Sequence, residues 1–273
     1  MVKHLFLLLF FLLCLKAKGI QSVVKDIIGP EEYSSKKKLI EIIFQDNDYF
    51  FDDGSLDYIK ILEKLESENL LKIQNKNTAS LKIAFSTSDH NLQIFLKVIK
   101  DTLFSLGFNN FYTIKAIKNF KEFVWIVSLG NNYTLDPLIF AKKLREKNVF
   151  ISDMKRYSLT NWNYVLNIKN ATIVTTKYPF DQEVQLTKSM RSYWLNLQDC
   201  KKITIKSYPS DSWHPYIVLY TKNLNIIKTI KKNRVIKEIS INIPLDAKYL
   251  KIDDLYTLKN IKNGFKIYLT KRK

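Results

Sequence analysis

Between residues 80 and 168 the apolar positions repeatedly change period, and this alternation constrains the fold more than any other feature of the chain. Residues 81–87 alternate apolar with polar or small side chains, which predicts a strand with one buried face. The apolar positions of residues 92–106 recur at spacings of three and four, which predicts a helix. Gly107 then supplies the left-handed stop that commonly ends a helix.

The remainder of this stretch predicts two further pairs of strands and a second helix. Asp136 and Pro137 are a capping acceptor and a favoured first helical residue, so we expect a helix from there to about Lys147. The four strands are expected at about 111–118, 122–129, 149–157 and 161–168. The order βαββαβ with one extra strand is that of a ferredoxin-like split βαβ arrangement, and it predicts an α+β domain over residues 80–169.

The first nineteen residues have the pattern of a secretory signal peptide. Lys3 and His4 form a basic front, an apolar run extends from Leu5 to Leu15, and Ala17 and Gly19 are small residues at the positions that a signal peptidase reads. We therefore expect residues 1–19 to be cleaved and the mature chain to have no transmembrane anchor. Retention of this run as an uncleaved anchor is the alternative.

Residues 20–79 are expected to form an N-terminal helical segment. Residues 20–35 are short and mixed in character, but Gly29 and Pro30 indicate a helix entry, and residues 36–45 carry an apolar stripe. A longer amphipathic helix is expected from residue 55 or 56 to about Leu71. We interpret this segment as a cap that packs on the ferredoxin-like sheet, with a separate small helical module as the alternative.

Beyond Lys169 the helical periodicity ends and short strands separated by polar turns take over. Eight strands at this spacing predict an all-β sandwich or jelly-roll domain over residues 170–273, with a domain boundary near Asn170. The expected strands are about Glu183–Thr187, Tyr193–Leu197, Lys202–Lys206, Tyr216–Thr221, Leu224–Ile230, Val235–Ile243, Tyr249–Ile252 and Phe265–Thr270.

The formal net charge of +18 does not by itself indicate nucleic-acid binding. Lysine, asparagine, isoleucine and tyrosine are abundant together, which is typical of AT-rich genomes, and arginine, the residue preferred for bidentate phosphate recognition, is scarce. From Ala171 onward there are 20 basic against 8 acidic residues, an excess of 12. We expect no nucleic-acid partner, only a modest attraction of this segment to acidic polymers that weakens with salt.

The chain carries no motif of a catalytic, metal or cofactor site. Asp211, Ser212 and His214 are close neighbours in one loop, whereas a catalytic triad normally draws its members from separate elements. Asp253 and Asp254 are adjacent, so in a strand they face opposite sides. Cys200 is the only cysteine after residue 19, which excludes an internal disulfide in the mature chain. We expect no enzyme, no catalytic residue, no metal and no cofactor.

The candidate binding residues are Trp213, His214 and Tyr216, which cluster on one connection of the predicted sandwich. An exposed aromatic face beside a polar group is a common way to stack on a sugar ring. The alternative is that Trp213 or Tyr216 closes the end of the sandwich as a core residue. Exposure of the rings separates these two interpretations.

Two parts of the chain resemble known families. The run Tyr58 to Ile73 (YIKILEKLESENLLKI), with the strand–helix unit after it, resembles uncharacterised periplasmic proteins of AT-rich bacteria of the epsilon class of proteobacteria, over about half of the chain. This resemblance implies a periplasmic location and brings no activity with it. Residues 213–220 and 243–252, with Asn263 and Gly264 before the last strand, resemble galactose-binding-like jelly rolls, a structural pattern that carries no ligand residues.

Together these observations predict an exported, non-enzymatic binding or scaffold protein of the bacterial cell envelope. Each of its two domains is expected to present a surface to an envelope protein partner. The alternative is a glycan- or peptidoglycan-binding protein that acts through the C-terminal sandwich, around Trp213 and Tyr216.

Overall fold

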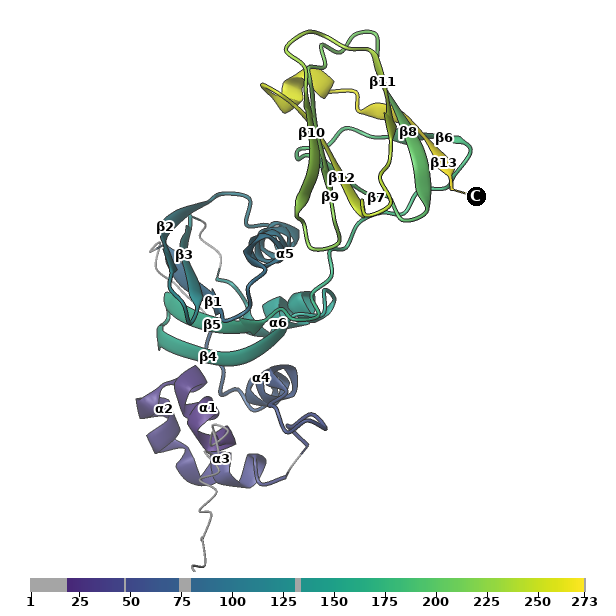
Figure 1. Cartoon of the computed structure of the whole chain (residues 1–273). Coiled ribbons are helices and arrows are strands. Elements are labelled where there is room, and N and C mark those ends of the chain that lie inside the picture. Colours follow the sequence, from purple (N-terminus) through teal and green to yellow (C-terminus); the bar gives the residue numbers. More distant parts are fainter. Residues whose placement is uncertain (1–18, 47, 74–79, 131–133, 273) are drawn as a thin grey trace, which may run out of the picture. The chain divides into compact units, whose positions relative to one another are not determined.

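The computed structural model describes residues 19–46, 48–73, 80–130 and 134–272. It confirms a mixed α+β protein, with about 24% helix and 36% strand in several sheets. The described residues divide into two compact units, the first within residues 19–89 and 102–170 and the second within residues 90–101 and 171–272 (Figure 1). The segment predicted as a signal peptide lies, as far as Lys18, outside the described residues.

The first unit begins with four helices: α1 (Ile20–Ile28), α2 (Pro30–Ser35), α3 (Lys37–Ile43) and α4 (Tyr58–Ser67). The short, mixed stretch 20–35 is therefore helical, because Val23, Val24 and Ile27 form a buried stripe too short to stand out in the sequence. Gly29 ends α1 with a φ of 95°, and Pro30 opens α2 at a first-turn position.

A five-stranded sheet forms the centre of the first unit. Its strands are β1 (Leu81–Thr87), β2 (Phe111–Lys118), β3 (Phe123–Leu129), β4 (Phe150–Ser158) and β5 (Asn161–Asn167), in the spatial order β2-β3-β1-β5-β4. The expected strands are thus present, within one residue or two of the predicted bounds. Strand β1 pairs antiparallel with β3 and parallel with β5, so β2 and β4 are the two edges.

Large aromatic side chains fill the core on one face of this sheet. Phe85 of β1 is fully buried, and its ring centroid lies 6.3 Å from that of Trp125, 5.6 Å from that of Phe140 and 5.9 Å from that of Tyr164. Phe140 belongs to α6 (Pro137–Arg145), which begins at the predicted cap: the Asp136 carboxylate accepts the amides of the second and third helical residues. The other expected helix is α5 (Leu92–Ser105).

Asp57 joins α4 to α6 through a buried carboxylate. It caps α4 by accepting the amide of Ile59 at 3.0 Å, and it receives two hydrogen bonds from the Arg145 guanidinium, at 2.8 and 3.2 Å. Burial by itself would raise the pKa of Asp57, but the Arg145 guanidinium and the helix amides outweigh it and hold this pKa below its ordinary value. The two helices are therefore tied by charge as well as by packing.

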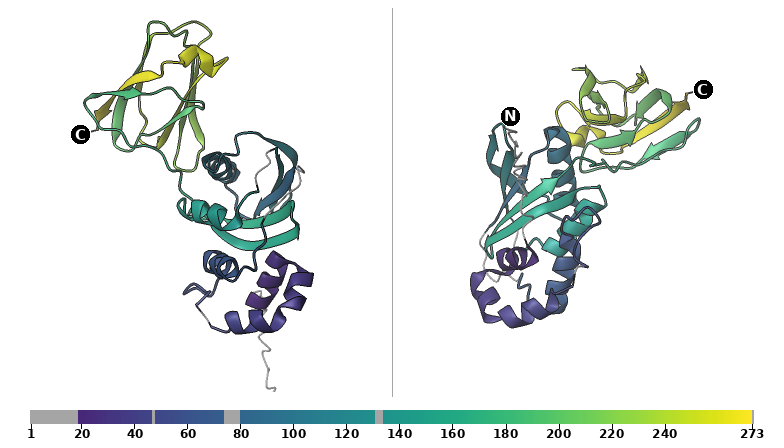
Figure 2. Two further views of the ribbon diagram at one scale, coloured as in Figure 1. Left: turned by 180° about the vertical axis from the view of Figure 1, so that it is seen from behind. Right: turned by 60° about the horizontal axis from the view of Figure 1, so that its bottom comes forward.

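The second unit contains two antiparallel four-stranded sheets that enclose one core (Figures 1 and 2). One has the order β10-β9-β12-β7 and the other β11-β8-β13-β6. The strands are β6 (Glu183–Leu186), β7 (Tyr193–Asn196), β8 (Cys200–Ser207), β9 (Pro215–Tyr220), β10 (Ile226–Lys231), β11 (Glu238–Asn242), β12 (Tyr249–Asp254) and β13 (Phe265–Lys271). All eight expected strands are present, with shifted ends.

Alternate side chains of both sheets meet in this core, as expected for sheets packed face to face. Ile203 and Ile205 of β8, Leu219 of β9, Leu250 of β12 and Phe265 of β13 are all essentially without exposed surface. Gly264 precedes β13 with a φ of 86°, and a Cβ there would lie 2.0 Å from the Leu186 carbonyl oxygen. Only glycine fits this position. No helix within the described residues is long and apolar enough to cross a membrane.

Replacing Asp57 by alanine is expected to lower the free energy of unfolding of the first unit by about 2–4 kcal/mol. The change removes a helix cap and leaves the partly buried Arg145 guanidinium without its carboxylate. Urea denaturation followed by amide hydrogen exchange, read separately for peptides of each unit, measures the effect. Asp53→Ala is the matched control, because the Asp53 carboxylate is exposed and accepts hydrogen bonds from the nearby Ser55. Equal losses in the two variants would contradict the role of Asp57.

Candidate functional site

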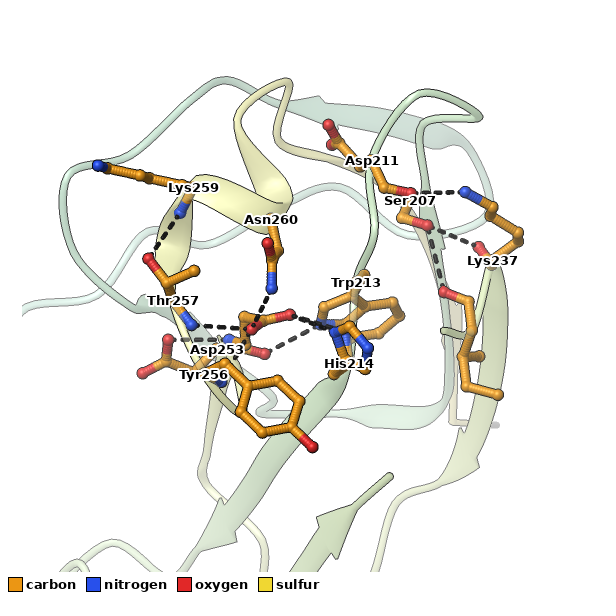
Figure 3. Close-up of polar contacts among 12 residues, drawn as sticks. Ser207, Asp211, Trp213, His214, Lys237, Asp253, Tyr256, Thr257, Lys259 and Asn260 are labelled. Carbon is orange, nitrogen blue, oxygen red and sulfur yellow. Dashed lines mark hydrogen bonds and ion pairs between the residues drawn. The ribbon is translucent and has the colours of Figure 1, made fainter. Parts of the chain in front are cut away.

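Two of the three candidate binding residues, Trp213 and His214, lie at one end of the second unit on the connection that leads into β9 (Figure 3). Tyr216 is the second residue of β9 itself. Trp213 has 0% of its surface exposed. Its indole nitrogen donates a hydrogen bond of 2.9 Å to the Asp253 carbonyl oxygen, and its ring centroid lies 4.7 Å from that of Phe265. A ring with no exposed surface cannot stack on a sugar, so Trp213 is a core residue that closes this end of the sheets.

His214 and Tyr216 keep part of their surface accessible. The imidazole of His214 packs edge-on against Tyr256 at 4.9 Å, and its Nδ1 atom lies 3.6 Å from the Asp254 carboxylate. The ring of Tyr216 is flanked by the ammonium groups of Lys231 and Lys251, 5.1 and 5.2 Å from its centroid. A ligand that stacked on Tyr216 would have to share the ring with these two cations.

Asp254 is the centre of the hydrogen bonds at this end of the unit. One carboxylate oxygen accepts the His214 amide at 2.7 Å, and the other accepts the amides of Tyr256 and Thr257 and the side-chain amide of Asn260, at 2.9, 2.9 and 3.0 Å. Burial would raise the pKa of this carboxyl, but the donors outweigh burial and hold the pKa below its ordinary value. The carboxylate thereby joins the connection that carries His214 to the loop that carries Tyr256, Thr257 and Asn260. Figure 3 shows these four donor residues close together.

Asp211 ties a third loop to the same end. Its carboxylate accepts two hydrogen bonds from Asn263, from the side-chain amide at 2.7 Å and from the backbone amide at 3.3 Å. Its backbone carbonyl accepts from the Lys237 ammonium at 2.5 Å. In the sequence, Asp211 lies next to the candidate site and Asn263 lies before the last strand. In the structure the two residues are hydrogen-bonded and hold their loops together.

The Asp254–His214 pair has the composition of a general base, but no hydroxyl or thiol contacts the imidazole among the residues that the structure describes. Ser210 is engaged with the side-chain amide of Asn263 instead. Within the described ranges no group of three or more His, Cys, Asp or Glu side chains converges as a metal site would require. The donors and acceptors around Asp254 are therefore arranged to close loops.

Cys200 lies in β8 and is buried. Burial raises the pKa of its thiol to about 11, and the thiol donates to the Lys202 carbonyl oxygen at 3.3 Å. A thiol held in its protonated form is a poor nucleophile. This agrees with a structural role for Cys200.

Each unit contains a cavity lined by described residues. The cavity of the first unit has a volume of about 790 Å³ and includes Asp53 and Asp153, which accept hydrogen bonds from Ser55 and Tyr58. The cavity of the second unit has a volume of about 520 Å³ and is lined in part by Gln198, Lys248 and Arg272. The Lys248 ammonium bonds to Gln198 and the Arg272 guanidinium to two backbone carbonyls. Asp53, Asp153, Lys248 and Arg272 are thus engaged within the protein.

The two edge strands of the five-stranded sheet, β4 and β2, differ in what packs along them. Helix α1 packs along β4, and Asp26 of this helix forms an ion pair of 3.5 Å with Lys155 of the strand. Strand β2 pairs with β3 on one side, and no other described strand pairs with it (Figure 1). Among the described residues, a helix packs along one edge, and no helix or strand is added to the outer side of the other.

The open edge carries exposed apolar side chains. Tyr112, Ile114 and Ile117 of β2 are 62%, 46% and 37% exposed, and Phe120 at the tip of the β2–β3 hairpin is 93% exposed. Lys115, Lys118 and Lys121 are interspersed among them and are also exposed. We call these seven residues the β2 surface. Such a mixture of apolar and basic side chains on an edge strand is found at protein-binding surfaces.

Sequence reasoning predicted the strand and the hairpin but not this surface. Apolar residues in a strand are expected to be buried, and nothing in the local sequence tells which strand becomes an edge. A signal was nevertheless present: the apolar residues of 111–121 break strict alternation and are mixed with three lysines.

Comparison of the chain with protein-family models, with curated proteins and with solved structures found no match.

Replacing Trp213 by alanine is expected to destabilise the second unit by about 3–5 kcal/mol, because it leaves a cavity and frees the Asp253 carbonyl from its donor. Urea denaturation, followed by hydrogen exchange of peptides from β9 and β12, measures the loss. Tyr216→Ala is the comparison, since its ring is partly exposed, and about 1 kcal/mol or less is expected there. An unchanged midpoint for Trp213→Ala would show that the indole is not a core residue.

The lowered pKa of Asp254 predicts a dependence of stability on pH. Its native pKa lies below the unfolded value of about 3.9, so its contribution is complete above about pH 5 and is lost as the pH falls through the native pKa. Asp254→Asn is expected to be less stable than the wild type at pH 7, by about 2 kcal/mol, and to show a flatter loss below pH 5.

The rate at which the Cys200 thiol reacts with a disulfide reagent at intermediate urea concentrations reports this stability, in a chain with Cys14 replaced by serine. Asp246→Asn is the control, because Asp246 is exposed on the surface of the same unit. Parallel pH profiles for Asp254→Asn and the wild type would refute the assignment.

Proposed function

We propose that this chain is an exported, non-enzymatic binding or scaffold protein of the bacterial cell envelope, and that it engages a protein partner through the β2 surface. The observation that carries this proposal is the contrast between the covered β4 edge and the open β2 edge. The secretory pattern of residues 1–19 and the resemblance of residues 58–73 to periplasmic proteins support the location.

An open edge with exposed apolar side chains is costly to maintain. Unpaired strand edges promote aggregation, and natural proteins usually cover or blunt them. Burying a side chain such as that of Phe120 is worth about 1.5–3 kcal/mol. A partner that covers the β2 surface therefore gains binding energy, while the three lysines keep the unoccupied edge solvated.

The finer fold assignments belong to the same proposal. In the first unit, β1 and β2 run parallel with β3 between them, which supports a ferredoxin-like split βαβ core with β5 as an added strand between β1 and β4. In the second unit, numbering the strands from one to eight gives the sheet orders 1-8-3-6 and 2-7-4-5. First pairs with last and second with seventh, which supports a jelly roll.

Glycan or peptidoglycan binding through the second unit is the alternative function. Burial of Trp213 removes the largest of its candidate rings, and Tyr216 is shared with Lys231 and Lys251. We favour the protein partner because all seven residues of the β2 surface are exposed, whereas Trp213 is buried and Tyr216 is only partly exposed.

Affinity capture from detergent-solubilised bacterial envelopes, before and after muramidase digestion and at low and high salt, tests the proposal. Phe120→Ser is expected to reduce recovery of a stoichiometric partner about tenfold or more, the effect of losing one buried aromatic contact. Leu245→Ser is the matched control, because Leu245 is 84% exposed in the second unit. Capture that survives Phe120→Ser, or that disappears with muramidase digestion, would refute a protein partner at the β2 surface.

A further inference from the structure

We propose that the partner binds by strand addition: an extended segment that carries acidic among apolar residues pairs with the outer edge of β2 and continues the sheet. This inference rests on the proposed function and specifies the partner's chemistry. Its first support is the direction of the backbone groups of β2, and its second is the charge of the side chains around them.

The hydrogen bonds at the two ends of the β2–β3 ladder determine which residues of β2 direct their N–H and C=O groups away from β3. Gly130 donates to the Asn110 carbonyl oxygen at 3.4 Å, and Asn119 donates to that of Glu122 at 3.1 Å. In an antiparallel pair, hydrogen-bonded positions alternate with positions whose N–H and C=O groups point away. Counting inward from each end, the residues of β2 that point away from β3 are Phe111, Thr113, Ala116 and Lys118.

The strand carries one irregularity. The register shifts between Thr113 and Lys115, so Ile114 is an extra residue, a β-bulge. A bulge and edge lysines are devices that discourage indiscriminate pairing. Two outward residues nevertheless lie on each side of the bulge, which leaves a short regular edge at either end for an added strand.

The charge of the side chains around the β2 edge indicates which kind of strand can bind there. Lys115 and Lys118 lie on opposite faces of the sheet, because their register partners Ile126 and Phe123 do, and Lys121 follows in the hairpin link. Residues 111–129 contain these three lysines and a single acidic residue, Glu122. Among the described residues, the ion pairs of lysine involve other positions and none of these three. An added strand with carboxylates on both faces would be attracted, and exposed Tyr112 and Ile117 favour apolar residues between them.

The same charges argue against a second copy of the chain. Two β2 edges in register would bring like charges together, and directly opposed like charges destabilise a strand pair. The edge thus combines an attraction for acidic strands with a repulsion of basic ones, which is how specificity is commonly obtained. A self-paired dimer remains an outcome that the experiment detects.

Fluorescence anisotropy with two labelled eight-residue peptides tests the proposal on the full chain. One peptide has the sequence EVVEEVVE, with glutamates on both faces of an extended strand, and the other is KVVKKVVK. We expect the wild type to prefer the acidic peptide at least about tenfold at low salt, with the preference reduced at high salt. The double variant Lys115→Glu with Lys118→Glu leaves the backbone groups in place and should reverse the preference.

Amide exchange measured by NMR separates strand addition from loose electrostatic attraction. The acidic peptide is expected to slow exchange of the amides of Thr113, Ala116 and Lys118 about tenfold or more, since these are unpaired in the free protein. Ala116→Pro removes one outward donor without touching the β3 ladder and should weaken binding about tenfold, whereas Ala116→Ser should not.

Each contrary result has a definite meaning. Equal affinity for both peptides, or binding without protection of these amides, overturns strand addition. Concentration-dependent dimerisation with the same amides protected in the absence of peptide assigns the edge to a second copy and overturns the acidic partner. If Phe120→Ser abolishes envelope capture while the peptides fail, the proposed function stands and strand addition falls. If Phe120→Ser also has no effect on capture, both fall.

Discussion

The hydrogen-bonding demand of sheet edges is the constraint on which the rest of this structure depends. Every strand that ends a sheet presents unpaired N–H and C=O groups, and these must be met by water, by another element or by a partner. The second unit meets the demand by distributing eight strands over two sheets, and its edge strands β6, β7, β10 and β11 have only four to six residues. The first unit has longer edge strands, of eight residues in β2 and nine in β4. Among the described residues, a helix packs along β4 but not along β2.

The N-terminal helices are positioned by their contacts with the β4 side of the sheet and with α6. Helix α1 lies along β4, and α4 is held to α6 by the bidentate contact between Asp57 and Arg145. A charged pair at this position gives orientation more than net stability, because removing charges from water costs about as much as their attraction returns. The described helices therefore pack along β4 in a defined way and not along β2.

Buried carboxylates serve the same ordering purpose in the second unit. Asp211 and Asp254 each collect several donors from loops that would otherwise expose backbone groups at the end of the sheets. The indole of Trp213 closes that end from the inside. A cluster with the composition of a binding site therefore contributes to loop closure. The surface that we propose for a partner lies in the first unit, on β2.

Much of the architecture is encoded locally. Alternation in residues 81–87, the Asp136–Pro137 helix start and the Asn263–Gly264 turn each act over a few residues, and all three appear where the sequence placed them, as do the mixed α+β class and the eight short strands. Local patterns also indicated that Cys200 is structural. The sequence did not predict short helices such as α1, because nine residues contain too few turns to establish a helical period.

Tertiary structure alone decided which residues are exposed. Trp213 and Phe120 are both aromatic residues in polar connections, and the sequence by itself marked the first as a candidate for binding. Packing buries Trp213 against Phe265 and leaves Phe120 in solvent at the hairpin tip. The reason is physical: periodicity determines which side chains share a face, whereas the order of strands in a sheet determines which face and which edge another element covers. That order depends on contacts between residues far apart in the chain, and no local pattern contains it.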